Sequence, residues 1–169
     1  MKSKRNLVLL GMMGSGKSTI GYLLSKSLNL EFCDIDLIIE KETGCKIAEF
    51  FNTEGENSFR KIEEKISIKT LKLNNKIISL GGGAFLNENI RKEVLSKNIS
   101  FWLDWKKDTL INRIKRNNKR PIASNLSHNE LRNLITSRSK LYAKAKYKIN
   151  CEDMEKMAIV NKIIRELKL

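Results

Sequence analysis

Short apolar runs alternate along the chain with longer stretches in which apolar residues recur every three or four positions. The short runs are typical of buried strands, and the longer stretches are typical of amphipathic helices. The expected strands are Leu7–Leu10, Glu31–Ile35, Lys76–Leu80, Ile99–Leu103 and Tyr147–Asn150. The expected helices are Ser18–Leu28, Leu37–Thr43, Ile47–Phe51, Glu56–Leu73, Asn89–Leu95, Thr109–Arg116, Asn129–Ala145 and Met154–Leu167.

This alternation predicts an α/β fold in which helices cover both faces of a parallel sheet. Ligands of such sheets bind beyond the carboxyl ends of the strands, so we expect functional residues just after the predicted strands. The chain has 169 residues, enough for one domain with a substantial core. The sequence contains no internal repeat or linker, and no apolar run approaches the roughly 20 residues of a membrane-spanning helix.

The first predicted strand leads into Gly11–Ser18, which reads GMMGSGKS, and a predicted helix follows at once. This is the P-loop pattern G-x-x-x-x-G-K-[ST] in the strand-to-helix context that it requires. Its glycines let backbone N–H groups point at phosphate oxygens, and the N-terminus of the helix adds to the positive field. Lys17 is placed to reach the β- and γ-phosphates, and Ser18 to ligate Mg²⁺. The pattern predicts binding of a nucleoside triphosphate.

Carboxylates and glycines follow the second and third strands. Asp34 and Asp36 end the second strand, where a period of two places both on the same side. Their mutual repulsion favours a cation or a bound hydroxyl between them, which in a P-loop protein suits Mg²⁺ and an acceptor alcohol. A solvated strand end would have the same sequence. Gly81–Gly83 ends the third strand and allows a ligand to approach the backbone closely, although a flexible turn would look the same.

Arginine is rare in this basic chain, with nine arginines beside 24 lysines. The arginines are therefore candidates for bidentate recognition of carboxylate or phosphate. Glu63 lies three residues after Arg60, a spacing that either orients the guanidinium or supports the helix. Arg120 precedes Pro121 in a polar stretch that we interpret as a mobile lid. The arginines in segments expected to border the carboxyl edge of the sheet are Arg60, Arg113, Arg116, Arg120 and Arg138.

Composition narrows the class of protein. The net charge of +14 favours anionic ligands, but lysines are scattered among acidic residues, which fits a solvated surface better than a nucleic-acid site. Cys33, Cys45 and Cys151 are widely spaced, which favours reduced thiols over disulfides or zinc. His128 is the only histidine and lies in a predicted capping box, so a histidine-based triad is excluded. The charged N-terminus does not read as a signal peptide, and we expect a cytoplasmic protein.

Together and in order, these motifs resemble shikimate kinase over essentially the full chain. The resemblance implies a single-domain P-loop kinase fold with a five-stranded parallel sheet flanked by helices, a substrate-binding segment at about 34–63 and a mobile lid at about 117–128. It implies ATP-dependent phosphorylation of the shikimate 3-hydroxyl, in the pathway to chorismate and aromatic amino acids. The motifs are Gly11–Ser18, Asp34–Asp36, Phe59–Glu63, Gly81–Gly83, Arg120-Pro121, and Arg138 four residues before Tyr142.

The resemblance also implies a role for each motif residue. Asp36 would hold the acceptor hydroxyl and, with Lys17 and Arg120, form the catalytic set. ATP would be bound by Gly14, Ser15, Gly16, Lys17, Ser18, Thr19, Arg113 and Arg120, with Arg113 against adenine. Shikimate would be bound by Asp36, Arg60, Gly81, Gly82, Gly83 and Arg138, with the two arginines on its carboxylate. Ser18 and Asp34 would hold Mg²⁺.

Shikimate and ATP are the expected partners of a monomer, with no nucleic acid and no membrane. The chain departs from the family pattern in two regions. The lid reads Arg120–Ala123 in place of Arg-Pro-Leu-Leu, and Lys140 replaces a proline common before the tyrosine. On the adenine side, Asn150-Cys151 and Lys156 stand where Asp-Thr and a later proline are usual.

Three alternatives remain open at this point. A related small-metabolite kinase, such as a gluconate kinase, would share the P-loop, but it should lack the glycine triplet combined with two paired arginines. A non-catalytic, ligand-binding relative is disfavoured by the intact Lys17, Asp36 and Arg120. A nucleic-acid-stimulated P-loop ATPase is suggested by the net charge alone.

Overall fold

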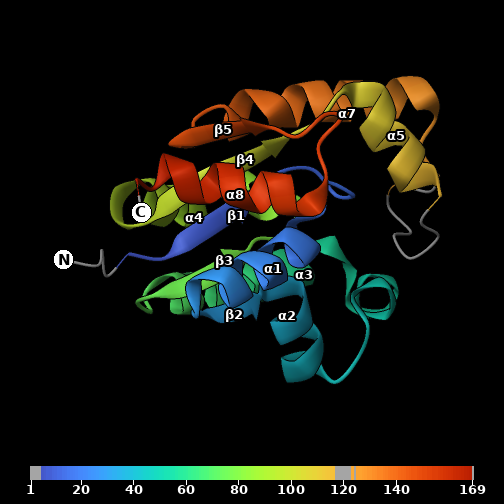
Figure 1. Ribbon diagram of the computed structural model, residues 1–169. Coiled ribbons are helices and arrows are strands. Elements are labelled where there is room, and N and C mark those ends of the chain that lie inside the picture. The colour runs from blue at the N-terminus through green and yellow to red at the C-terminus, as the bar shows by residue number, and fades with distance from the viewer. Residues whose placement is uncertain (1–4, 117–122, 124, 169) are drawn as a thin grey trace.

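The computed structural model describes residues 5–116, 123 and 125–168 of the chain. Within them, five parallel strands form one sheet in the order β2-β3-β1-β4-β5 (Figure 1). Leu7 of the central strand lies opposite Ile77 on one side and Ile99 on the other. The predicted α/β fold with a five-stranded parallel sheet is confirmed. The strands are β1 (Leu7–Leu10), β2 (Glu31–Asp34), β3 (Lys76–Ser79), β4 (Ile99–Asp104) and β5 (Tyr147–Asn150).

Alternate residues of β1 enter two hydrophobic cores, one on each face of the sheet. Val8 and Leu10 pack in the core that α2, α3, α4, α5 and α7 cover, whereas Leu7 and Leu9 pack in the core under α1 and α8. Figure 1 shows α1 and α8 in front of the sheet, with α4 behind it. The helices of the described chain are α1 (Lys17–Leu28), α2 (Ile35–Thr43), α3 (Ile47–Leu71), α4 (Glu88–Lys97), α5 (Lys107–Lys115), α7 (His128–Tyr142) and α8 (Lys156–Glu166), with a 3₁₀ turn, η1, at Ala84–Leu86.

The element α3 contains the two helices predicted on either side of residue 55. Gly55 interrupts the helical backbone between them with φ 79° and ψ 171°. The two helices therefore meet at a sharp kink at this glycine, and the first continues beyond its predicted end at Phe51. Among the described helices, none is long and apolar enough to cross a membrane.

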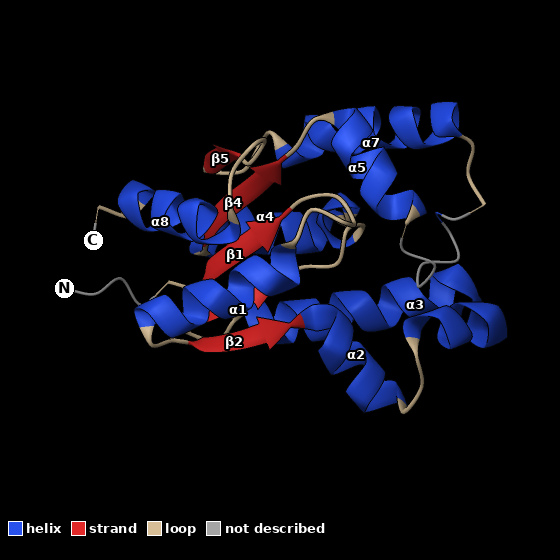
Figure 2. Ribbon diagram, turned by 45° about the vertical axis from the view of Figure 1, so that its right-hand side comes forward, coloured by secondary structure: helices blue, strands red, loops and turns tan. Residues whose placement is uncertain are grey.

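All five strands point toward the same end of the molecule. Figure 2 shows α2, α5 and α7 gathered beyond the arrowheads of the strands. Segments far apart in sequence therefore meet at the carboxyl edge of the sheet, where ligands of parallel α/β folds bind.

Candidate active site

The loop after β1 has the backbone of a phosphate-binding turn. Gly14 and Gly16 take φ values of +77° and +87°, which residues with a side chain rarely adopt. The Ser15 N–H donates to the Met12 carbonyl at 3.1 Å and closes the turn. Gly16 is the N-cap residue of α1, so the positive end of that helix faces into the loop.

Lys17 is buried, and its ammonium lies inside the loop. The Nζ atom donates to the carbonyls of Gly11 at 2.8 Å and Met12 at 3.0 Å. The positive charge is thus held beside the loop amides. Ser18 and Thr19 follow on the first turn of α1 with exposed side chains.

The expected strand end at Asp34–Asp36 is wrong, because the helix α2 begins at Ile35. The Asp34 carboxylate accepts from the Asp36 N–H at 3.1 Å and from the Leu37 N–H at 3.5 Å, so it caps the helix. A carboxylate at this position competes with strand pairing and turns the chain into a helix. The two aspartates therefore do not alternate on a strand, and Asp36 projects from the first helical turn.

Asp36 nevertheless lies against the glycine triplet that follows β3. Its Oδ1 atom is 3.0 Å from the position that a Cβ on Gly81 would occupy, and Glu63 Oε1 is 2.7 Å from that position. A side chain at Gly81 would collide with both carboxylates. The carboxyl edges of β2 and β3 therefore meet, as the sequence predicted.

Arg60, on α3, lies over the last residue of the triplet. Its Nη1 is 2.7 Å from the position of a Cβ on Gly83, and it donates to Glu63 at 2.6 Å. The Glu63 side chain is 3% exposed, and burial raises the pKa of its carboxyl above the usual range, although Arg60 pulls that pKa down. Glu56 pairs with the same guanidinium at 3.1 Å. The spacing of Arg60 and Glu63 could orient the guanidinium or merely support the helix. Because Glu63 is buried, the structure favours orientation of the guanidinium.

Arg138, on α7, reaches the same triplet from the other side of the site. It is buried, and its Nη1 donates to the Gly82 carbonyl at 3.4 Å. No described residue is a hydrogen-bond partner of its buried Nε. The hydroxyl of Tyr142 donates to the same carbonyl, and burial raises the pKa of Tyr142 to about 12. The structure thus brings Arg60, Arg138, Asp36 and the glycine triplet together.

A second group of residues forms a cavity beside the P-loop. Arg113, on α5, stacks on Trp105, with the Cζ atom 3.7 Å from the ring centroid. The Trp105 indole N–H donates to the Ser15 carbonyl at 3.0 Å. The cavity has a volume of about 530 Å³. It is lined by Ser15, Gly16, Thr19, Ile20, Trp105, Arg113, Met154, Glu155, Lys156, Met157 and Ile159.

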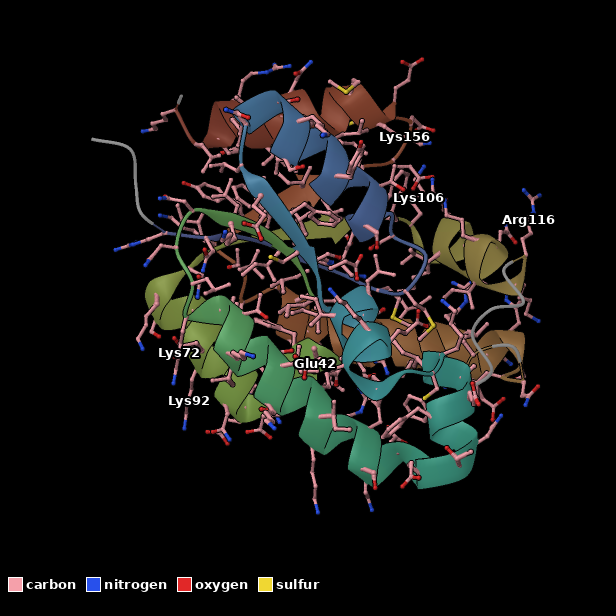
Figure 3. All side chains as sticks on the ribbon, turned by 90° about the horizontal axis from the view of Figure 1, so that it is seen from below. Glu42, Lys72, Lys92, Lys106, Arg116 and Lys156 are labelled. Atoms are coloured by element: carbon pink, nitrogen blue, oxygen red, sulfur yellow. The ribbon has the colours of Figure 1, made fainter. Side chains whose placement is uncertain are left out.

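The structure also describes two residues at which the chain departs from the family pattern, and one further arginine. Lys156 belongs to the lining of this cavity, together with Gly16 and Thr19 at the start of α1. Cys151 is buried, which raises the pKa of its thiol to about 12. Arg116 is exposed at the end of α5, at the periphery of the molecule (Figure 3).

Arg120 and most of the predicted lid, at about 117–128, lie outside the described residues. The capping box at the start of α7 is confirmed: Ser127 and Glu130 each bond the backbone N–H of the other. Three contributors were not assigned from the sequence, namely the buried Glu63, the Tyr142 hydroxyl and Trp105. For Glu63 a signal existed in its spacing from Arg60, and for Tyr142 in its spacing from Arg138, although neither spacing indicated the contact that the side chain makes. For Trp105 we find no signal.

Comparisons with known proteins agree on one family over nearly the full chain. The family model "Shikimate kinase" matches residues 13–168. The shikimate kinase of Persephonella marina is 36% identical over 164 residues, which are 97% of this chain and 99% of that protein. The structure of the Acinetobacter baumannii shikimate kinase in complex with shikimate superposes with a TM-score of 0.92 at 29% identity, over 99% of this chain and 94% of that chain. A gluconokinase from Sinorhizobium meliloti shares the fold alone, with a TM-score of 0.56 at 13% identity over 99% of this chain and 98% of that chain.

Proposed function

This chain belongs to the shikimate kinase family, and from that premise we propose how its own residues carry out the reaction. It is an ATP-dependent kinase that phosphorylates shikimate, in the pathway to aromatic amino acids. The observation that carries the assignment of the acceptor site is the convergence of Arg60 and Arg138 on Gly82-Gly83 beside Asp36. This arrangement suits an acceptor with both a carboxylate and a hydroxyl group.

The P-loop would hold the triphosphate of ATP. Lys17 and the loop amides lie where they can neutralise charge on the β- and γ-phosphates, and charge compensation is the main requirement of phosphoryl transfer. The cavity beside the loop would take the base, with Arg113 against it. Arg120, outside the described residues, is proposed to close over the transferring phosphoryl group.

Oxygen donors at the start of α1 and at the end of β2 fit Mg²⁺. The hydroxyl of Ser18 is exposed, and the Asp34 carboxylate uses only its Oδ1 atom for capping, so both residues keep an oxygen that a hard cation prefers. Within the described part of the chain, no group of three or more His, Cys, Asp or Glu side chains is placed to hold a metal ion. Mg²⁺ typically needs only one or two protein ligands beside phosphate oxygens. When bound, the ion neutralises phosphate charge.

Asp36 would orient the 3-hydroxyl of shikimate toward the γ-phosphorus of ATP and accept its proton. The new P–O bond would form as the bond from the γ-phosphorus to the β,γ-bridging oxygen breaks, and ADP would be the leaving group. Its place against Gly81 brings the acceptor oxygen next to the backbone of the triplet. Arg60 and Arg138 would bind the shikimate carboxylate with planar pairs of N–H donors. Alignment of the two substrates would then supply much of the catalysis. Because one chain supplies all these residues, we also propose that the enzyme acts as a monomer.

Coupled measurement of ADP release, with shikimate, gluconate and single-stranded oligonucleotides added separately, tests the proposed function. We expect rapid turnover with shikimate and only background ATP hydrolysis with the other two. Lys17→Ala is the matched control and should be folded but inactive, because Lys17 serves the phosphates and not the core. Preferred turnover of gluconate, or stimulation by oligonucleotides alone, would overturn the assignment.

A further inference from the structure

Trp105 follows β4 directly, and the reaction proposed above gives it no role. Its indole N–H donates to the Ser15 carbonyl of the P-loop at 3.0 Å. The face of its ring lies 3.7 Å from the Arg113 guanidinium carbon. One side chain therefore connects the loop that would hold the phosphates with the arginine that would meet the base.

We propose that Trp105 is a positioning residue of the nucleotide site, an inference that rests on the proposed use of ATP. A guanidinium has two flat faces, and the ring covers one of them, so the other is left for the purine. A long arginine side chain loses rotamer freedom when it stacks on a ligand. Cation–π contact with Trp105 removes that freedom from Arg113 before the nucleotide binds.

The hydrogen bond to Ser15 acts on the phosphates by a second route. The Ser15 carbonyl and the Gly16 N–H belong to one planar trans peptide, so they point in opposite directions. Fixing the carbonyl on Trp105 therefore aims the Gly16 N–H away from the indole. Trp105 would thus orient one P-loop donor as well as Arg113.

Residues of both routes line a single cavity. Its volume of about 530 Å³ is within the range of small-molecule sites, and Ser15, Gly16 and Thr19 line it together with Trp105 and Arg113. Met154, Lys156 and Met157 contribute a further part of the wall. A nucleotide with its phosphates in the loop would place its base in this cavity.

Two substitutions separate the routes. Trp105→Phe keeps a ring face but loses the N–H donor. It should lower the affinity for ADP and the affinity for inorganic tripolyphosphate by the same factor, about two- to tenfold. Trp105→Leu also loses the aromatic face. It should lower the affinity for ADP by a further factor of about three to thirty, whereas the affinity for tripolyphosphate should be the same as in Trp105→Phe. The KM for shikimate should stay unchanged in both variants.

Calorimetric titration of ADP and of tripolyphosphate into the full chain measures these factors, with unfolding curves to confirm that each variant is folded. Trp102→Phe is the matched control, because Trp102 is buried in β4, and its ADP affinity should equal that of the wild type. Unchanged ADP affinity in both folded Trp105 variants would overturn the proposal, as would equal loss of ADP and shikimate affinity. ADP binding is measured without turnover, so failure of the wild type to phosphorylate shikimate would reject the proposed function separately.

Discussion

The guanidinium of Arg138 is buried, and its Nε has no described partner, whereas Nη1 reaches Gly82. A lysine ammonium has no planar fork with which to bind a carboxylate in this position. Arg138→Lys should therefore raise the KM for shikimate about ten- to a hundredfold, the range for a lost charged hydrogen bond, and leave ATP binding nearly unchanged. Steady-state kinetics with each substrate varied separately measures both effects.

A change in shikimate itself complements the substitution of Arg138. Shikimate with its carboxylate replaced by an amide should be a poor substrate of the wild type and lose little more in Arg138→Lys. Fully additive losses would show that Arg138 does not recognise the carboxylate.

We expect the stability of the protein to depend on pH through the carboxyl group of Glu63. Burial raises the pKa of its carboxyl above the ordinary value of 4.5, so the native chain binds this proton more tightly than the unfolded chain. The contribution of Glu63 to stability is therefore fully present below about pH 4.5 and is lost as the pH rises through the native pKa.

Glu63→Gln removes this titration while it keeps the size of the side chain. The free energy of unfolding of the wild type should fall relative to that of the variant as the pH rises from about 4.5. Urea unfolding of both proteins across that range measures the difference. A constant difference, or one of opposite sign, would show that burial does not dominate the ionisation of Glu63.

Most of the candidate site could be predicted residue by residue because its motifs have fixed spacing. Lys17 and Asp36 follow strands that the apolar pattern reveals, and two rare arginines point to an anion. Tyr142 and Trp105 could not be assigned from the pattern, because a lone aromatic residue gives no sign of the distant carbonyl that its polar group will meet. Those contacts join residues 60 and 90 positions apart.

At the scale of the elements, the N-cap residue Asp34 determines where β2 ends and α2 begins. Asp34 ends β2, accepts two N–H bonds from α2, and is also the proposed Mg²⁺ ligand. Asparagine caps helices as well as aspartate does, but it lacks the charge. Asp34→Asn should keep wild-type stability and raise the Mg²⁺ concentration for half-maximal activity about tenfold or more. Asp34→Ala should do the same and also lose about 1 kcal/mol of stability.

Urea unfolding and a Mg²⁺ titration of activity, applied to both variants, separate the cap from the metal site. If Asp34→Asn shows the Mg²⁺ dependence of the wild type, Asp34 acts only as a cap.

The inner strands β1, β3 and β4 were predictable at this scale because nearly all their residues are buried, as expected where helices cover both faces. The edge strands β2 and β5 carry exposed polar residues and gave a weaker apolar signal. The start of α2 was missed, since period-two alternation and a capping aspartate fit the same three residues. Only the hydrogen bonds of Asp34 distinguish the two. The two helical patterns on either side of Gly55 correspond to two helical segments of α3, which are separated by a kink at that glycine.

For the whole molecule, the net charge of +14 acts on two anionic substrates at once. Raising the salt concentration from about 0.05 to 0.5 M shortens the Debye length several-fold and weakens long-range attraction. The KM values for ATP and shikimate should both rise, by roughly three- to tenfold, while kcat changes little because salt screens the short-range contacts within the bound complex much less. Steady-state assays in NaCl, with sucrose of equal osmolality as the control, measure this. KM values that do not change with salt would show that the net charge serves solubility and does not attract the substrates.

The crowding around Gly81–Gly83 bears on how this enzyme could escape an inhibitor. A Cβ at Gly81 would meet Glu63 at 2.7 Å, one at Gly82 would meet the Met13 backbone nitrogen at 3.0 Å, and one at Gly83 would meet Arg60 at 2.7 Å. Any substitution that disturbs a compound bound there also displaces Asp36, the P-loop or Arg60, and so impairs the enzyme itself. An inhibitor that hydrogen-bonds to the backbone of Gly81–Gly83 should therefore meet few resistance substitutions that keep the enzyme active. An inhibitor that binds through Lys156 or Met157 should meet many such substitutions.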